Sequence, residues 1–273
     1  VDPRHRPLGS LALSRLLRSR RGVHIQDIMN DDVTPVPVDM DQEELADMFR
    51  RKDTVSVPVT DETGRLIGVV TIDDIVDVID EEHEDDMMRM GGLSGDDLYR
   101  AVMETAKSRF PWLITNLVTA VLASMVIAQF DATIQQIVAL AVLMPIVASM
   151  GGNAGTQTLT VVVRALATRE LSRGNALRLV GKEMIVGAAN GFLFAVLAGG
   201  MAWVWFGDKA LGGVIGAAMV VNMISAGLFG AAIPVVLERM NIDPAIASTV
   251  LLTTVTDVVG FLAFLGLAAA VLL

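Results

Sequence analysis

The residue whose chemistry stands out is Asp257, the only charged side chain between Pro244 and Leu273. The run around it is apolar and longer than the roughly 20 residues that a helix needs to cross a bilayer. Asp257 lies near the middle of this run, where a carboxylate costs at least about 2.5–3.5 kcal/mol. We therefore expect it to face a polar cavity, a partner or a cation. The alternative is a structural acid that is hydrogen-bonded inside a helical bundle.

Further polar groups lie in an apolar setting between Met144 and Gln157. The stretch contains a proline, three glycines and two amides: Pro145, Gly151, Gly152, Gly155, Asn153 and Gln157. Proline kinks a helix, and glycines let helices approach closely in membranes. Asn153 and Gln157 are four residues apart and share one helix face. This face either lines an ion pathway, with amide oxygens and freed carbonyls available to a hydrated ion, or holds neighbouring helices together.

Carboxylates also gather between Asp73 and Asp86, where no Lys or Arg interrupts them. The nine acids are Asp73, Asp74, Asp77, Asp80, Glu81, Glu82, Glu84, Asp85 and Asp86. Several recur at three- and four-residue steps, so they share a helix face and repel each other. The ordinary interpretation is a solvated face. The alternative is a binding site for Mg²⁺ or Ca²⁺, which prefer oxygen ligands.

The composition limits the partners. The formal net charge is −10 although 53% of the residues are apolar, which is typical of a membrane protein that deals with cations. This charge disfavours nucleic acid and anionic lipid as partners. The chain has no Cys, and its three His are scattered, so disulfides and a zinc-like ligand spacing are excluded.

The polar first part of the chain contains a repeat with an offset of 59 residues. The stretch from Asp61 to Val76 is echoed by the stretch from Asp2 to Leu17. The second copy predicts a strand, a helix opened by Asp41, two strands and a helix beginning at Asp73, and this order resembles a CBS domain. The first copy has only its last strand and helix. We therefore expect the chain to begin partway through a CBS repeat.

CBS pairs often bind adenine nucleotides, and the resemblance would place Thr71 and Asp74 beside a ribose. ATP is the cofactor that this implies. The alternative is that both residues start the following helix and need no ligand. A cut first repeat weakens the nucleotide interpretation.

Five membrane segments are predicted after the polar part: 112–129, 134–163, 184–206, 211–237 and 245–273. Basic residues near the segment ends number eight on one side and one, Lys209, on the other. The eight are Lys107, Arg109, Arg164, Arg169, Arg173, Arg178, Lys182 and Arg239. Since basic residues mark the cytoplasmic side, the CBS part should be cytoplasmic and the C-terminus outside a multi-pass plasma membrane protein.

The stretch from Pro145 to Gln157 looks like the signature of the MgtE family of Mg²⁺ transporters and channels, and the order of parts is also similar. The fold class is then an α-helical membrane protein with five transmembrane helices after a cytoplasmic α/β CBS-type domain. We expect a first-repeat remnant over 1–30, a second CBS repeat with the acidic helix over 31–90, a connecting or plug helix over 91–110, and the pore domain over 111–273. The resemblance also leads us to expect a form without the acidic N-terminal domain that is usual in the family.

The resemblance implies a homodimer whose pore lies on the two-fold axis between the second and fifth membrane helices. Asp257 inherits the family's pore carboxylate, with Asn153, Gln157, Gly151, Gly152, Thr253 and Thr256 around it. Cytosolic Mg²⁺ closes the pore in the family. The matching acids here are Asp53, Asp74, Asp77, Asp80, Glu82, Asp85, Asp86 and Asp243. A polar position ahead of the pore acid, often Asn in relatives, is Thr249 in this chain.

We therefore predict a Mg²⁺ channel or transporter that is not an enzyme and is gated by cytosolic Mg²⁺. An intramembrane aspartyl protease needs two membrane Asp residues, and only Asp257 is available in one chain. The remaining alternative is a membrane-anchored CBS sensor of divalent ions that does not transport. An Asn153 and Gln157 face and a mid-membrane carboxylate are more than an anchor requires.

Overall fold

The structure is a computed structural model that describes residues 1–93, 100–168, 170–171 and 174–273. The chain divides into two compact units, Val1–Asp86 and Met87–Leu273. We describe each unit by itself.

The first unit contains a small three-stranded sheet with helices. Its elements are α1 (Leu13–Arg18), the 3₁₀ turn η1 (Ile25–Asp27), β1 (Val36–Pro37), α2 (Gln42–Lys52), β2 (Ser56–Thr60), β3 (Leu66–Thr71) and the greater part of α3 (Ile72–Met90). The strand order is β1-β2-β3, with β1 parallel and β3 antiparallel to β2. The predicted CBS-like order of strand, helix, two strands and helix is confirmed. Asp41 caps α2 by accepting a hydrogen bond from the Glu43 N–H at 2.8 Å.

The predicted repeat is visible as one turn built twice. Asp2 Oδ1 accepts from the N–H groups of Arg4 and Arg6 at 2.9 and 2.7 Å, and Asp61 Oδ1 accepts from those of Thr63 and Arg65 at 2.8 and 2.9 Å. The left-handed residue is His5 in the first copy, with φ 67°, and Gly64 in the second, with φ 80°. The two copies therefore share a local conformation as well as a sequence pattern.

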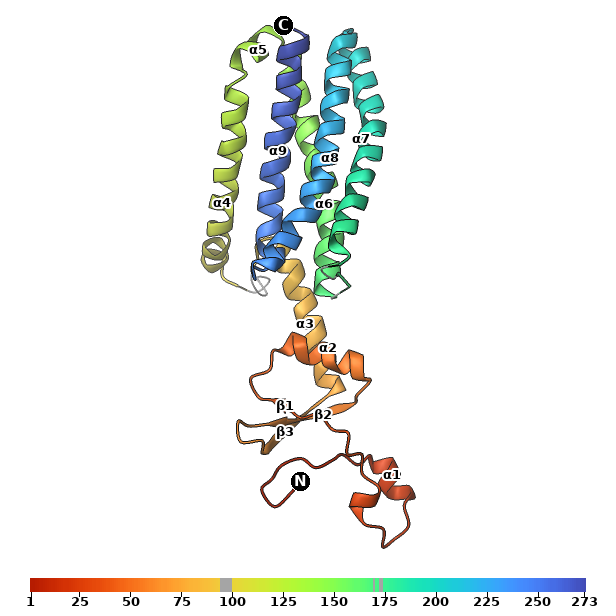
Figure 1. The fold of residues 1–273 in the computed structure, drawn as a ribbon. Coiled ribbons are helices and arrows are strands. Elements are labelled where there is room, and N and C mark those ends of the chain that lie inside the picture. Colours follow the sequence, from red (N-terminus) through yellow and green to blue (C-terminus); the bar gives the residue numbers. More distant parts are fainter. Residues whose placement is uncertain (94–99, 169, 172–173) are drawn as a thin grey trace. The chain divides into compact units, whose positions relative to one another are not determined.

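The second unit is a bundle of long helices (Figure 1). Its helices are α4 (Val102–Ala128), α5 (Asp131–Gln136), α6 (Ala139–Ala167), α7 (Ala176–Phe206), α8 (Lys209–Arg239) and α9 (Pro244–Val271). Within the described residues, five of them are long and apolar enough to cross a membrane. The predicted fold class, five membrane helices after an α/β CBS-type part, is confirmed.

Two boundaries differ from the prediction. The connecting helix and the first membrane segment form one continuous helix from Val102 to Ala128, which contains Pro111. The start of the predicted connecting helix, residues 94–99, lies outside the described residues. The predicted second segment is divided into the short α5 and the long α6, because the helix ends at Gln136 and begins again at Ala139.

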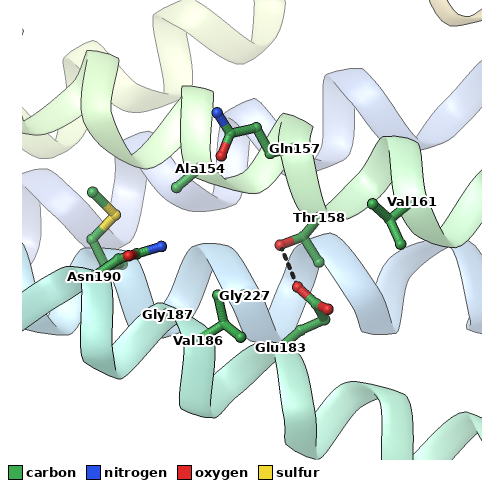
Figure 2. Close-up of a pocket in the computed structure, with 10 residues that line it drawn as sticks. Ala154, Gln157, Thr158, Val161, Glu183, Val186, Gly187, Asn190 and Gly227 are labelled. Atoms are coloured by element: carbon green, nitrogen blue, oxygen red, sulfur yellow. Dashed lines mark hydrogen bonds between the residues drawn. The ribbon is translucent and has the colours of Figure 1, made fainter.

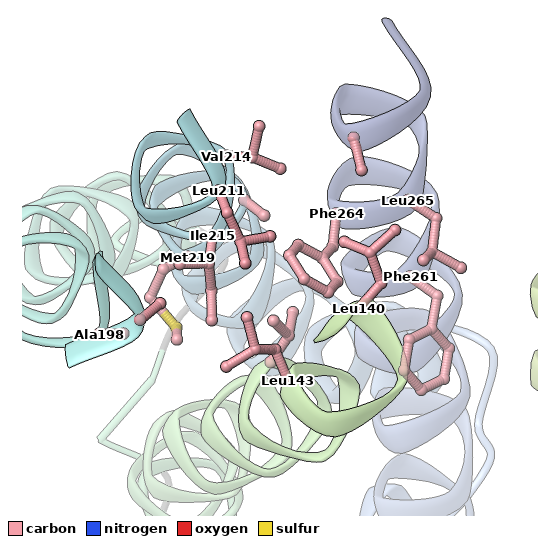
Figure 3. Packing of buried hydrophobic residues seen from close by; sticks show 14 of the residues in the cluster. Leu140, Leu143, Ala198, Leu211, Val214, Ile215, Met219, Phe261, Phe264 and Leu265 are labelled. Carbon is pink, nitrogen blue, oxygen red and sulfur yellow. The ribbon is translucent and has the colours of Figure 1, made fainter. Parts of the chain in front are cut away.

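The bundle is held by an apolar core between α6, α8 and α9 (Figure 3). Leu140 and Leu143 of α6 face Ile215 and Met219 of α8 and Phe264 of α9, and all five are fully buried. α8 packs against α6, α7 and α9. It is therefore the central helix to which the helices carrying the polar residues are fixed.

Candidate ion pathway

Asp257 lies near the middle of α9 and is half-buried. Its carboxylate has no hydrogen-bond or ion-pair partner among the residues that the structure describes. Within the described residues, Asp257 is therefore not the structural acid, hydrogen-bonded inside the bundle, that was the alternative interpretation. A mid-membrane carboxylate in this condition needs a cation or a group from outside the chain.

Other polar side chains on α6 and α9 are also uncovered. Asn153 and Gln157 of α6 and Thr253 of α9 are exposed. The two helices pack together, and a Cβ placed on Gly152 would lie 3.9 Å from Thr253 Cγ2. We call Asn153, Gln157, Thr253 and Asp257 the open face. Exposed amides at membrane depth are costly against lipid, so this face should meet a partner or water.

Two residues predicted to line the pore lie inside the bundle. Thr256 is fully buried, and its hydroxyl donates to the Leu252 and Thr253 carbonyls of its own helix at 3.0 and 3.1 Å. Gly151 is also buried, because it packs against α8. The open face therefore excludes both residues.

A buried amide that was not predicted from the sequence holds the three central helices together. Asn222 of α8 is fully buried and donates from Nδ2 to the Val147 carbonyl of α6 at 2.7 Å. A Cβ on Gly151 would overlap this amide, and one on Gly260 of α9 would lie 2.8 Å from Nδ2. We call Gly151, Asn222 and Gly260 the glycine seam. An Asn within an apolar run, with glycines on the facing helices, was the available signal.

The last turn of α3 lies in the same unit as the membrane helices and contacts the start of α9. Arg89 Nη1 lies 2.9 Å from Asp243 Oδ2, and Asp243 also caps α9 by accepting from the Ala245 N–H at 2.8 Å. The Thr249 hydroxyl donates to the Met90 carbonyl at 3.3 Å. Asp243 and Thr249, both singled out from the sequence, are thus engaged by the residues that end α3.

The predicted gating acids in the first unit lie at several places. Asp53 ends α2 in a left-handed conformation, and Asp77 and Asp80 are exposed on α3. Glu82, Asp85 and Asp86 are half-buried. In the described part of the chain, no three acidic or His side chains converge as metal ligands would.

Glu43, which was not among the predicted site residues, lies near two of these acids, Glu82 and Asp86. Partial desolvation raises the pKa of the Glu43 carboxyl, and the negative charges of Glu82, Asp41 and Asp86 raise it further. The neighbouring Gln42 donates from Nε2 to Glu82 Oε1 at 2.5 Å. α2 and α3 therefore bring repelling carboxylates together within the first unit.

Thr71 and Asp74 contact each other at the start of α3. Asp74 Oδ2 accepts from the Thr71 N–H at 3.0 Å and from its hydroxyl at 2.8 Å. These bonds hold the pKa of the Asp74 carboxyl below its ordinary value. This is one half of a capping box, so both residues have a structural role without a ligand.

The fold and these residues define a class: a multi-pass α-helical membrane protein with an uncompensated intramembrane acid, joined to a CBS-type unit. Comparison with known families agrees. Residues 144–267 match the MgtE model, described as a divalent cation transporter, and residues 25–81 match the CBS domain. The chain therefore carries the transporter domain of the MgtE family together with a CBS domain, and the resemblance seen in the sequence is confirmed.

Curated relatives extend this similarity over nearly the whole chain. The magnesium transporter MgtE of Thermus thermophilus is 36% identical over 100% of this chain and 61% of its own length. The magnesium transporter MgtE of Bacillus subtilis is 34% identical over 96% of this chain and 58% of its own length. The chain thus spans about three fifths of the length of these relatives.

Solved structures similar to part of this chain include the following one. The cytosolic domain of the Mg²⁺ channel MgtE in complex with ATP is 42% identical over 29% of this chain and 32% of that chain, with a TM-score of 0.28. At this TM-score the likeness adds nothing to the description of the fold.

Proposed function

We propose that this chain forms a homodimeric Mg²⁺ channel in the plasma membrane, with the open face of α6 and α9 as the ion pathway. One observation carries the proposal: Asp257 is a mid-membrane carboxylate without a partner in the described chain, and it lies on the same open face as Asn153, Gln157 and Thr253. The match of residues 144–267 to a divalent cation transporter family supports a cation as the missing partner.

A dimer follows from the chemistry of the ion. Mg²⁺ sheds water reluctantly and prefers six oxygen ligands, so a single carboxylate cannot dehydrate it. Two Asp257 carboxylates facing each other across a two-fold axis neutralise its charge and hold it with most of its water. The same pairing covers the open face, which one chain leaves exposed.

The driving force for uptake is the membrane potential. A divalent cation moving inward gains about 4.6 kcal/mol per 100 mV, twice the value for a unit charge. The excess of basic residues next to the membrane segments supports an orientation with the CBS part in the cytoplasm and the C-terminus outside. Electrical driving force alone then moves Mg²⁺ into the cell.

Such a pathway needs a mechanism that closes it when internal Mg²⁺ is plentiful. We assign this gating to cytosolic Mg²⁺ that binds at the acidic residues. The acids are Asp53, Asp74, Asp77, Asp80, Glu82, Asp85, Asp86 and Asp243. Repulsion among carboxylates such as Glu43 and Glu82 is relieved when a divalent ion binds between them. The contacts of Arg89 and Met90 with the start of α9 supply a mechanical link from the end of α3 to the helix that carries Asp257.

A nucleotide at Thr71 and Asp74 is a separate and smaller proposal, supported by the CBS match over 25–81. Calorimetric titration of the purified protein with ATP tests it, using Thr71→Ala as the variant. Heat that saturates for the parent protein and disappears for the variant supports the site, whereas identical titrations remove it.

The test of the main proposal is Mg²⁺ flux into liposomes that contain the purified protein. Asp257→Asn keeps the shape of the side chain and removes its charge, so we expect flux to fall at least about tenfold, about 1.4 kcal/mol on the barrier. Asp208→Asn is the matched control, because Asp208 caps the start of α8 and is not on the open face. Equal flux through Asp257→Asn and the parent protein would reject the pathway.

A further inference from the structure

A second intramembrane carboxylate, separate from Asp257, lies beside a cavity between α6, α7 and α8. The cavity has a volume of about 140 Å³, and residues of all three helices line it. Two glycines in its lining bring α7 and α8 into backbone contact: a Cβ on Gly187 would lie 2.5 Å from the Met223 carbonyl oxygen, and one on Gly227 would overlap the Glu183 carbonyl oxygen. The space is therefore bounded by closely packed helices.

Glu183 of α7 carries the charge of this cavity. The residue is 8% exposed, and its Oε2 accepts from the Thr158 hydroxyl of α6 at 3.1 Å (Figure 2). Its other partner within the described residues is Lys182, whose Nζ lies 3.9 Å from Oε1 and whose side chain is 68% exposed. A carboxylate can accept about four hydrogen bonds, so one hydroxyl and one distant ammonium leave it poorly compensated for its burial.

Two carboxamides add neutral oxygens to the same cavity. Gln157 lies on α6 beside Thr158, and Asn190 lies on α7 about two turns beyond Glu183. In Figure 2 the Asn190 amide extends toward the Thr158 and Glu183 pair. A purely structural role, a hydrogen bond between α6 and α7, explains only the contact of Thr158 with Glu183. A neutral Gln at position 183 would make the same bond with a lower desolvation cost. The structural role does not account for a charge beside a cavity with two further polar walls.

We propose that the Glu183 cavity binds a monovalent alkali cation, Na⁺ or K⁺. The Glu183 carboxylate is the charged ligand, and the Thr158 hydroxyl and the Gln157 and Asn190 carbonyl oxygens are the neutral ligands. The charge count favours a monovalent ion: the carboxylate has only a distant and exposed ammonium beside it, and a single carboxylate does not neutralise a divalent ion in an apolar setting. The volume accommodates the ion with a few waters.

This site is separate from the Asp257 carboxylate, but it shares one residue of α6 with the open face. Gln157 lines the cavity and also belongs to the open face. Asp257 does not line the cavity. A bound cation would therefore fix the part of α6 that carries the open face, without being the ion that the channel conducts.

Thermal unfolding of the purified full chain in detergent, free of divalent ions, tests the proposal. NaCl and KCl are each compared with N-methyl-D-glucamine chloride at equal ionic strength, because this organic cation is too bulky for the site. We expect one of the alkali ions to raise the Tm of the parent protein by roughly 2–5 °C, saturating with concentration. Glu183→Gln should remove this difference, and Asp257→Asn should retain it.

Three results would overturn the assignment: no alkali effect on the parent protein, the same effect in Glu183→Gln, or an effect that only MgCl₂ produces. If Glu183→Gln does not fold, Asn190→Ala takes its place, because Asn190 is exposed and we expect its truncation to be tolerated. It should raise the half-saturating alkali concentration several-fold with an unchanged Tm in N-methyl-D-glucamine chloride. An unchanged half-saturating concentration would contradict the site.

Discussion

Helix α6 has two polar faces that the chain treats in opposite ways. On the side of α8, the glycine seam encloses the Asn222 amide, which is fully buried and bonds to the Val147 carbonyl. On the side of α9, the open face leaves Asn153 and Gln157 exposed and Asp257 without a partner in the described residues. Both faces lie in apolar helices at membrane depth, so composition does not distinguish them.

The difference indicates that one polar face of α6 stabilises the helix bundle and that the other serves the ion pathway. A buried amide that bonds across helices makes the bundle rigid, since breaking the bond exposes groups that the surroundings cannot satisfy. A polar face that is left uncovered is costly unless water, an ion or another chain completes it. We therefore assign the seam to the stability of the protomer and the open face to the ion pathway and the dimer.

The largest expected effect is on the seam. Gly151→Ala places a methyl group onto the Asn222 amide. Because Asn222 is fully buried, its side chain cannot move away unless α6 or α8 shifts. We expect a loss of stability of about 1–3 kcal/mol or more, measured as the Tm in detergent. Gly152→Ala is the matched control, because its new Cβ would be 3.9 Å from the nearest side-chain atom, an ordinary contact.

A second variant makes that result specific. Asn222→Ala removes the amide, so Gly151→Ala should cost much less in the Asn222→Ala background than in the parent chain. If the two adjacent alanine variants are equally stable, or if the costs simply add, the seam does not lock α6 to α8.

On the open face, the same type of polar group should affect flux and not stability. Asn153→Leu removes an exposed amide whose partner is Ser149 Oγ of its own helix, at 3.3 Å. We expect Mg²⁺ flux to fall about tenfold, about 1.4 kcal/mol on the barrier, with a Tm at or above that of the parent. A large loss of Tm with unchanged flux would reverse the roles of the two faces.

The contact between α3 and α9 allows a smaller test of gating. The Arg89 guanidinium occupies the Asp243 carboxylate, so Arg89→Gln leaves this acid with more capacity for Mg²⁺. We expect closure at a several-fold lower internal Mg²⁺ concentration, measured by flux into liposomes preloaded with Mg²⁺. Arg239→Gln, an exposed cation at the end of α8, should behave like the parent. A shift to higher Mg²⁺ would show that the ion pair itself holds the pathway closed.

The smallest effect concerns the carboxylates of the first unit. Because the pKa of Glu43 is raised above its ordinary value of 4.5, the folded state binds this proton more tightly than the unfolded state does. Its contribution to stability is present below pH 4.5 and is lost as the pH rises through the raised pKa. In the parent protein, the backbone amides of α2 should therefore lose hydrogen-exchange protection between pH 4 and pH 7. Glu43→Gln should make this loss smaller, whereas Glu44→Gln should leave it unchanged.

Most of the fold could be predicted from local sequence patterns. The two strands that precede Asp73 and the helix opened by Asp41 depend on neighbouring residues alone and were predicted, and hydropathy predicted the membrane segments. The continuous α4 was not foreseen, because the connecting helix over 91–110 and the membrane segment over 112–129 were predicted as separate elements. Thr256 was assigned to the pore although it lies inside the bundle, since sequence spacing does not say which side of α9 a neighbour covers. Asn222 and Glu183 were missed because their significance depends on glycines and hydroxyls on other helices.

The central claim, that the open face is an aqueous ion pathway, is tested most directly by cysteine accessibility in this naturally cysteine-free chain. Thr253→Cys and Thr256→Cys differ by three positions on α9, one exposed and the other fully buried. A positively charged, membrane-impermeant thiol reagent should modify Thr253→Cys and block its Mg²⁺ flux, and added Mg²⁺ should slow this reaction. The same reagent should leave Thr256→Cys unmodified. An unreactive Thr253→Cys, or modification that Mg²⁺ does not slow and that leaves flux intact, would contradict the account.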